Sequence, residues 1–180
     1  MLRRILDFDE STDHAGWRSV DDVVMGGISQ SELLQLEQGI ARFAGVVSLE
    51  RGGGFASVRT GPRDWSTQGA VAFVLRCCGD DHAYKLTLRT TDDFDGVQYQ
   101  HRFVTQSRTW RTVRLAVADF VPSFRGRVVL GAPPLDPGKV RQLGLMISEK
   151  QAGAFELLVD WIAVETSGVA DNSDGPVTQP

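Results

Sequence analysis

Adjacent carboxylates and scattered histidines are the side chains of this sequence that could hold a metal ion or move a proton. Three acidic pairs lie in segments typical of loops: Asp21–Asp22, Asp80–Asp81 and Asp92–Asp93. Loop carboxylates are common Ca²⁺ ligands, but none of these pairs completes a calcium-loop pattern, so solvated acidic turns explain them. His14, His82 and His101 have neither the i, i+4 pairing nor the cysteine partners of a zinc site. We therefore expect no metal and no cofactor.

Nucleophilic chemistry has few candidates. The sequence contains neither a Gly-x-Ser-x-Gly elbow nor the Cys–His–Asn spacing of a thiol hydrolase. Cys77 and Cys78 are adjacent, and neighbours in a strand point to opposite faces, so we expect free thiols. The glycine-rich segments Val23–Gly27 and Gly52–Gly54 lack the spacing of a phosphate-binding loop, and turn geometry explains them. We expect no catalytic residue; an enzyme using one of the two thiols is the alternative.

Length and net charge limit the classes of protein to which the chain can belong. The chain has 180 residues and a formal net charge of −4, which disfavours a general electrostatic attraction to nucleic acid or anionic lipid. No apolar run approaches the roughly 20 residues that a membrane-spanning helix needs. The first residues lack the apolar region of a signal peptide. These features predict a cytoplasmic protein.

Short runs in which apolar and polar residues alternate dominate the chain. In Tyr84–Arg89 every second residue is apolar, so Lys85, Thr87 and Arg89 fall on the opposite face of a predicted strand. A second run places four apolar residues on one predicted face: Phe155, Leu157, Val159 and Trp161. Ala70–Leu75 is apolar on both faces, as expected of a strand inside a sandwich. The fold class predicted from these runs is all-β, a two-sheet antiparallel β-sandwich.

Three segments complete the expected organisation. Ser29–Gln38 carries leucines that fit a helix or a strand, and we interpret it as the first arm of a hairpin that returns through Ile40–Phe43. Asp136 followed by proline favours one short helical turn. Residues 1–165 are predicted to form one β-sandwich domain, and residues 166–180 have almost nothing to bury and are predicted to be a disordered tail.

One tryptophan is a candidate for binding. The chain has four: Trp17, Trp65, Trp110 and Trp161. Trp110 is out of phase with the apolar positions of Val113–Val117, which predicts an exposed ring. An open aromatic flanked by Lys85, Arg59 and Gln100 would suit a sugar ring or a protein partner. Packing within the sandwich is the alternative.

Six blocks follow one another along the chain: Trp17–Ser29; Phe43–Gly45 with Ser48–Leu49; Gly53–Arg59; Gly79–Asp80 with Tyr84–Lys85; Phe120–Gly126; and Leu143–Gln151 with Gly153 and Phe155. In this order they resemble the complex I intermediate-associated protein 30 family. The resemblance spans Trp17 to about Glu165. It implies a galactose-binding-like jelly roll related to carbohydrate-binding modules. Mitochondrial members act as chaperone-like factors in assembly of the proton-pumping NADH:ubiquinone oxidoreductase, which implies protein partners and a non-catalytic role.

The chain departs from the family pattern at two positions and at its start. Val23 stands where many relatives have glycine, and Asp81 replaces a glycine that often follows the Gly-Asp pair. Four acidic residues precede Trp17, which is wrong for a mitochondrial presequence, so a bacterial protein is expected. A jelly-roll carbohydrate-binding module is the alternative function.

The resemblance and the residue types together nominate a binding surface. Its candidate residues are Asp22, Met25, Gly26, Gly27 and Ser29 in the first loop, with Arg59, Lys85 and Trp110 on strands. The glycines would let a loop backbone approach a partner closely, and the two cations would bind acidic or carbonyl groups. An ion pair of Asp22 with Arg59 inside the sandwich is the structural alternative.

Overall fold

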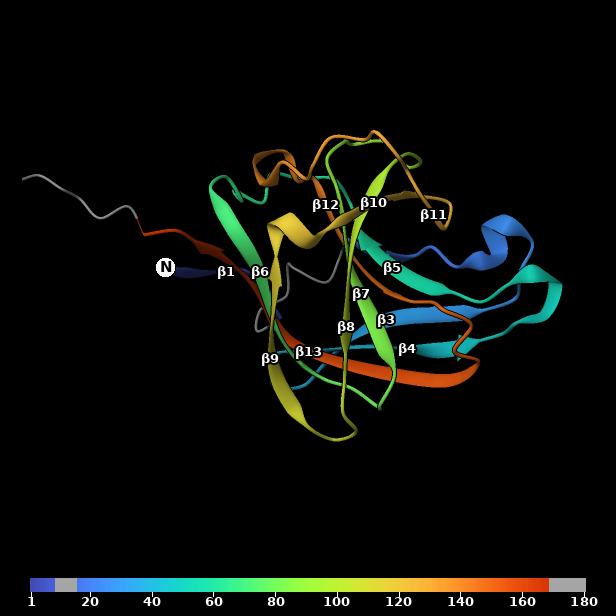
Figure 1. Cartoon of the computed structure of the whole chain (residues 1–180). Helices are drawn as coiled ribbons and strands as arrows, with labels where there is room; N and C mark the ends of the chain where they lie inside the picture. The colour runs from blue at the N-terminus through green and yellow to red at the C-terminus, as the bar shows by residue number, and fades with distance from the viewer. Residues whose placement is uncertain (9–15, 169–180) are drawn as a thin grey trace, which may run out of the picture.

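The chain folds into two packed sheets of antiparallel strands (Figure 1). The computed structural model describes residues 1–8 and 16–168. The first sheet contains β1 (Leu2–Asp7), β3 (Gln30–Leu36), β4 (Ile40–Val47), β6 (Ala70–Cys78), β9 (Trp110–Ala116) and β13 (Gly153–Thr166). The second sheet contains β2 (Trp17–Ser19), β5 (Ala56–Thr60), β7 (Ala83–Arg89), β8 (Gln98–Val104), β10 (Val121–Phe124), β11 (Arg127–Val128) and β12 (Gln142–Ile147). The predicted antiparallel β-sandwich is confirmed.

Strand order in both sheets is non-sequential. The first sheet has the order β3-β4-β13-β6-β9, with β1 also paired to β13, and the second has β11-β10-β8-β7-β12-β5-β2. In the second sheet, β12 therefore lies between β5 and β7, although it follows both by more than fifty residues in the chain. Short 3₁₀ turns join strands: η1 (Asp22–Met25), η2 (Glu50–Gly52), η3 (Val117–Asp119) and η4 (Pro137–Lys139).

The core fills the space between the sheets, and the alternation of β7 is confirmed. Tyr84, Leu86 and Leu88 are fully buried in the central cluster of apolar side chains. Lys85, the next residue after Tyr84, belongs to the opposite face and is only half-buried. Because successive strand residues point to opposite sides, the polar half of β7 faces away from the core.

The hairpin and the short helical turn are confirmed. β3 and β4 pair from Gln30 opposite Val46 to Leu36 opposite Ile40. The backbone φ angle is +71° at Gln38 and +72° at Gly39, the left-handed region that tight hairpin loops use. At η4, the Asp136 side chain accepts a hydrogen bond from Gly138 N at 3.0 Å.

Trp161 is buried, but the prediction that it shares a face with Phe155, Leu157 and Val159 is wrong. The pairing of β13 with β6 slips between Val159 and Trp161, which is a β-bulge. The extra residue reverses the alternation, so Trp161 packs with Val74 and Ala163 in a small separate cluster. The Arg4 guanidinium lies 5.2 Å from the centre of the indole ring and covers it.

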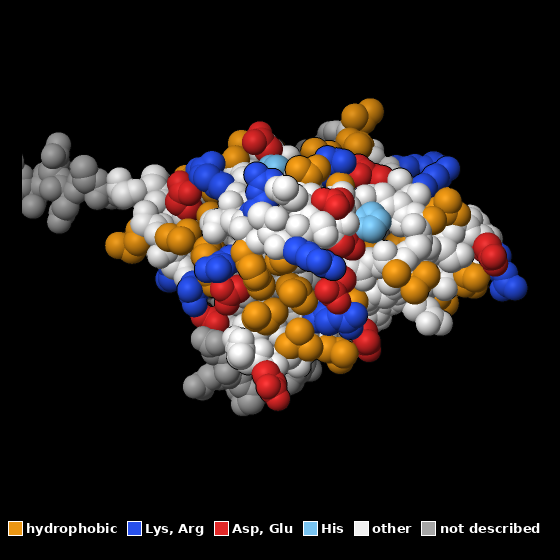
Figure 2. Space-filling model, turned by 90° about the horizontal axis from the view of Figure 1, so that it is seen from below, with side chains coloured by type: hydrophobic (Ala, Val, Ile, Leu, Met, Phe, Trp, Pro, Cys, Tyr) orange, Lys and Arg blue, Asp and Glu red, His pale blue; other side chains and the backbone are white. Residues whose placement is uncertain are grey.

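The outer face of the first sheet carries paired charges. Arg42 bonds Glu156 at 2.6 Å and Arg114 bonds Glu165 at 2.8 Å, both between strands. Figure 2, viewed from below Figure 1, shows cationic and anionic side chains lying beside one another among hydrophobic ones.

Two further findings concern the chain as a whole. No helix in the described ranges is long and apolar enough to cross a membrane. β13 ends at Thr166, and most of the predicted tail, residues 169–180, lies outside the described residues. The domain boundary at residue 165 therefore stays a prediction.

Candidate ligand-binding groove

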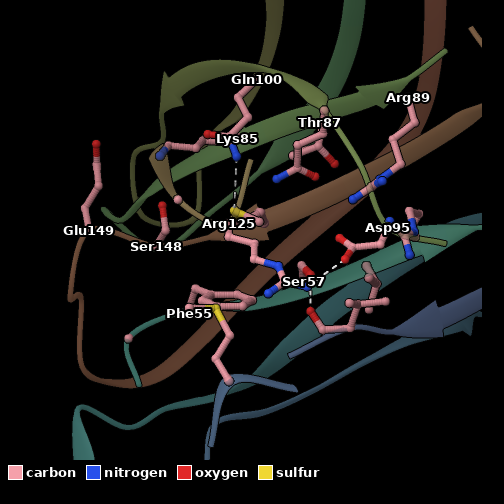
Figure 3. Close-up of a pocket in the computed structure, with 18 of the residues that line it drawn as sticks. Phe55, Ser57, Lys85, Thr87, Arg89, Asp95, Gln100, Arg125, Ser148 and Glu149 are labelled. Atoms are coloured by element: carbon pink, nitrogen blue, oxygen red, sulfur yellow. Dashed lines mark hydrogen bonds and ion pairs between the residues drawn. The ribbon is translucent and has the colours of Figure 1, made fainter. Parts of the chain in front are cut away.

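The outer face of the second sheet forms the floor of a groove of about 550 Å³ (Figure 3). Strands β5, β7, β8 and β12 supply the floor, and loops from both ends of the sheet supply the walls. The cavity is lined by polar, charged and apolar side chains in similar measure, which is typical of a site that binds a ligand with mixed chemistry.

Strand register decides which residues meet on the floor. Gly144 of β12 pairs with Arg59 of β5 on one side and with Thr87 of β7 on the other. Thr87 in turn pairs with Gln100 of β8. Arg59, Gly144, Thr87 and Gln100 therefore form one row across the sheet. Lys85 and Arg89 flank Thr87 on the same face of β7.

Gly144 is closely packed against its neighbours at the centre of this row. A Cβ atom at this position would overlap the Thr87 hydroxyl oxygen and lie 3.0 Å from the Val58 carbonyl oxygen. Glycine is therefore required by close packing on the floor. The Thr87 side chain occupies the space that a side chain at position 144 would need.

Two arginines on the floor are buried without a counter-ion. Arg59 is 6% exposed and Arg89 is 8% exposed. Arg59 donates from Nη2 to the Phe94 carbonyl oxygen at 2.9 Å, and its guanidinium lies 4.8 Å from the centre of the Phe94 ring. Among the described residues, Nε of both arginines and Nη1 of Arg89 have no hydrogen-bond partner. No described carboxylate lies within ion-pair distance of either guanidinium.

The electrostatics of the two arginines follow from this burial. Desolvation, followed by repulsion from Arg89 and Arg18, lowers the pKa of Arg59 to about 10. Desolvation also lowers the pKa of Arg89. Asp95 attracts both groups, but its carboxylate is held by Arg125 at 2.8 Å at the rim. The floor is therefore electropositive within a chain whose net charge is negative.

The walls add apolar surface to this polar floor. Phe94 and Met25 are about half exposed, and each contributes to the lining. Met146 lies on the floor, where Gln100 Nε2 approaches its sulfur at 3.9 Å. Figure 3 shows Phe55 across the groove from Lys85 and Gln100.

The first loop is held in place by a buried carboxylate. Asp22 is 1% exposed and accepts hydrogen bonds from Ser29 N at 2.9 Å and Ser29 Oγ at 2.5 Å. It also accepts from Gly54 N at 2.8 Å and Phe55 N at 3.4 Å. Burial alone would raise the pKa of this carboxyl, but the hydrogen bonds outweigh burial and the pKa is lowered.

One glycine of the first loop and one of the segment before β5 make room for that carboxylate. A Cβ atom at Gly27 or Gly53 would overlap the Asp22 carboxylate. Gly26 has a φ of +90°, which ends η1 in the left-handed region. The neighbouring Asp21 accepts from Ser31 and Ser57, and its pKa is raised by burial in spite of these bonds. The acidic pair and the glycines thus build the loop that bounds the groove.

The structure brings together three of the nominated residues and separates the others. Met25, Arg59 and Lys85 line the groove. Asp22 and Ser29 are buried inside the first loop, Gly27 is buried beside them, and Gly26 is exposed. The alternative ion pair of Asp22 with Arg59 is wrong, because Asp22 is bonded to Ser29 and to backbone N–H groups instead.

The predicted neighbourhood of Trp110 is also wrong. Trp110 is partly exposed, as expected, but it lies on β9 of the first sheet. Its ring is 5.4 Å from the Arg76 guanidinium, and Lys85, Arg59 and Gln100 belong to the second sheet. Sequence reasoning missed Arg89 as a groove residue, although it shares the alternation of Lys85. Nothing in the sequence signals Phe94 as part of a site.

The cysteines considered for catalysis are buried, and Asp80, considered as a metal ligand, is bonded to neighbouring residues. Cys77 and Cys78 are free and buried, and desolvation raises the pKa of Cys77 to about 12 and also raises that of Cys78. Asp80 accepts from Tyr84 OH at 2.8 Å and Glu156 N at 2.7 Å, and lies 2.9 Å from His82 Nδ1. No cluster of metal-binding side chains occurs within residues 1–8 and 16–168. His14 lies outside the described residues.

Comparison with known sequences identifies relatives. A family model described as complex I intermediate-associated protein 30 matches residues 6–159. An uncharacterized protein of Schizosaccharomyces pombe is 30% identical over 167 residues, covering 81% of this chain and 76% of that protein. The mitochondrial complex I intermediate-associated protein 30 of Neurospora crassa is 27% identical over 172 residues, covering 83% of this chain and 62% of that protein. The chain thus spans about three-fifths of the Neurospora relative.

Comparison with solved structures concerns the fold. The family 11 carbohydrate-binding module of a Clostridium thermocellum cellulosomal cellulase superposes with a TM-score of 0.68 at 14% identity, covering 92% of this chain and 95% of the module. A family 11 module from the same organism, in complex with a β-1,3-1,4-mixed-linked tetrasaccharide, superposes with a TM-score of 0.64 at 14% identity and with the same coverage. An agarase superposes with a TM-score of 0.58 at 14% identity, covering 93% of this chain and 25% of the agarase. These similarities show a shared jelly-roll sandwich.

Proposed function

This chain belongs to the complex I intermediate-associated protein 30 family, and on that premise we propose that it is a non-catalytic binding module in the assembly of a complex I type respiratory complex. The groove on the second sheet is the observation that supports this proposal best. It presents hydrogen-bonding side chains and apolar side chains on one open face, while the thiols are buried with raised pKa values.

The proposed partner is a protein segment of the respiratory complex or of one of its assembly intermediates. An extended segment lying along the groove would meet Lys85, Thr87 and Gln100 on the floor and Met25 and Phe94 on the walls. Polar floor groups would fix its orientation, and the half-exposed apolar side chains would supply contact area. The first loop, including Asp22, Gly27 and Ser29, would position Met25 rather than touch the partner.

Affinity capture from solubilised membranes of the host tests this function. We expect subunits of the respiratory complex to be enriched with the wild-type chain and lost with Lys85→Glu. Arg111→Glu is the matched control, because Arg111 is exposed on β9 of the other sheet and the change in charge is identical. If Lys85→Glu captures the same subunits as the control, the groove is not the binding surface. If no respiratory subunit is enriched over an untagged control, the assembly function is wrong.

Carbohydrate binding is the second candidate, and the composition of the floor favours it. Thr87, Gln98 and Gln100 offer neutral hydrogen-bonding groups suited to sugar hydroxyls, and the Phe94 ring is about half exposed beside them. Calorimetric titration with the β-1,3-1,4-mixed-linked tetrasaccharide is the direct test. A heat of binding that is present in the wild-type chain and absent in Gln100→Ala would support this candidate. The absence of any heat of binding at millimolar sugar would exclude this ligand.

The cellular location remains a prediction. The Neurospora relative is named as a mitochondrial protein, whereas a cytoplasmic bacterial protein is expected from this sequence. Fractionation of the host with an antibody against the chain would distinguish the membrane-associated pool from the free pool.

A further inference from the structure

We infer that the floor of the groove contains an oxyanion subsite, in which Arg59 and Arg89 bind a carboxylate or phosphate group carried by the ligand. This inference rests on the proposed function, because it names the chemistry that the same groove recognises. It goes further by assigning a charged group to the ligand and two residues to that group.

The first argument is the missing counter-ion. Arg59 and Arg89 are more than nine-tenths buried, and each retains guanidinium N–H groups without a partner among the described residues. A buried arginine normally has a carboxylate partner, because an uncompensated charge away from water is costly. Here two such cations lie close enough to repel each other. A bound anion would compensate both.

The second argument is the set of charges around the pair. Arg18 and Lys85 add positive charge on the same side of the sheet: Arg18 pairs in register with Arg59, and Lys85 lies on β7 with Arg89. Asp95 is the carboxylate that acts on both arginines, and it bonds Arg125 at 2.8 Å. The other acidic residue of the lining, Glu149, bonds Arg102 at 3.1 Å. The nearby negative charges are therefore already paired, and the positive charge on the floor is in excess.

The third argument is access. Both arginines line the cavity, and Figure 3 shows Arg89 and Thr87 reaching into it from the same strand. The unpaired N–H groups are themselves shielded from solvent. An oxyanion in the cavity would reach those of Arg59 by displacing the half-exposed Phe94 ring beside its guanidinium, with the Thr87 hydroxyl available as a further donor.

Thermal unfolding of the purified full chain at constant ionic strength tests the subsite without any partner protein. Sodium phosphate and sodium glutarate are the two probes, and sodium chloride is the reference salt. We expect at least one probe to raise the melting temperature in a saturable way. A rise with phosphate alone indicates a phosphorylated ligand, and a rise with glutarate indicates an acidic one. If neither probe raises the melting temperature beyond the chloride reference, the inference is wrong.

Substitutions then assign the effect to the two arginines. Arg89→Gln and Arg59→Gln should each weaken binding of the effective probe by about 10- to 100-fold, which is the range expected for losing a hydrogen bond to a charged group. Arg111→Gln, on the other sheet, should leave it unchanged. If Arg89→Gln does not fold, Arg89→Lys keeps the charge and should retain binding at reduced affinity. Equal binding by all variants would overturn the assignment.

The outcomes separate this inference from the proposed function. Probe binding that depends on Arg59 and Arg89, with no capture of respiratory subunits, would support the subsite and reject the assembly role. Capture that depends on Lys85 but survives Arg59→Gln and Arg89→Gln would support the assembly role and reject the subsite.

Discussion

The carboxylate of Asp22 accepts a hydrogen bond from Gly54 N at 2.8 Å, although the two residues are 32 positions apart in the chain. This bond fastens η1 to the segment that leads into β5. Because Met25 follows in η1 and Phe55 follows Gly54, the same bond determines where two apolar side chains of the groove lie. Asp22 thus positions side chains that line the groove, although it does not line the groove itself.

We predict that Asp22→Ala lowers the free energy of unfolding by about 3 kcal/mol. The substitution leaves the buried backbone N–H groups of Ser29 and Gly54 without their acceptor, at a cost of about 1–3 kcal/mol each, and also removes the longer bond from Phe55 N. Urea denaturation followed by tryptophan fluorescence measures the change. Asp119→Ala is the control, because Asp119 is exposed and should change stability by less than about 0.5 kcal/mol. Equal effects of the two substitutions would contradict this account of the loop.

The same carboxylate predicts part of the dependence of stability on pH. Its folded pKa lies below the ordinary value of 3.8, so the deprotonated form binds its partners and stabilises the fold. This contribution is fully present above about pH 4 and is lost as the pH falls through the folded pKa. Stability measured between pH 5 and pH 2.5 should therefore fall less steeply in Asp22→Asn than in the wild-type chain. Parallel curves would show that other carboxyls govern the acid transition.

Arg89→Met should raise the melting temperature by about 2–6 °C at pH 7 in a buffer without multivalent anions. Removing one of two buried cations relieves both desolvation and repulsion. Burial has a similar effect at Arg59, whose pKa is about 10 in the folded chain instead of the ordinary 12.5. Its charged form therefore lowers the stability of the fold below about pH 10. This loss of stability becomes smaller as the pH rises from 10 towards 12.5. Differential scanning calorimetry compares the variant with Arg111→Met. A lower melting temperature in Arg89→Met alone would mean that Arg89 stabilises the sheet.

Gly144→Ala should destabilise the fold by about 1–3 kcal/mol, because the new methyl group overlaps the Thr87 hydroxyl. The double variant Gly144→Ala with Thr87→Ala should recover part of this loss, since it removes the overlapping oxygen. The Val58 carbonyl, 3.0 Å from the added carbon, limits the recovery. A double-mutant cycle from urea denaturation measures the coupling. Strict additivity of the two changes would show that the residues do not meet as described.

The two thiols should react slowly in the native protein. Cys77 and Cys78 are buried, and the raised pKa values keep them protonated at pH 8. We expect the reaction with a disulfide reagent to be at least about 100-fold slower than in urea, where both thiols are exposed. Fast reaction of one thiol in the folded chain would support the alternative that the protein is an enzyme using one of the two thiols. Unchanged probe binding by Cys77→Ala would separate the thiols from the groove.

Much of the fold was predictable from local patterns. The alternation of Tyr84–Arg89 assigned its apolar residues to the core, and that assignment is confirmed. The hairpin and the turn at Asp136 are confirmed for the same reason, because they depend on residues close together in the chain. The bulge after Val159 escaped prediction, since one extra residue in a strand leaves the sequence pattern apparently regular while it reverses the faces.

The site was less predictable than the fold. Period-two alternation by itself determined that Lys85, Thr87 and Arg89 share a face, because successive side chains of a strand must point to opposite sides. Only the tertiary structure decided that this face meets Arg59 and Gly144, and that Trp110 lies on the other sheet. Strand order depends on how the two apolar faces pack over the whole chain. The insertion of β12 between β5 and β7, which joins residues 59, 87 and 144 in one row, has no local signature in the sequence.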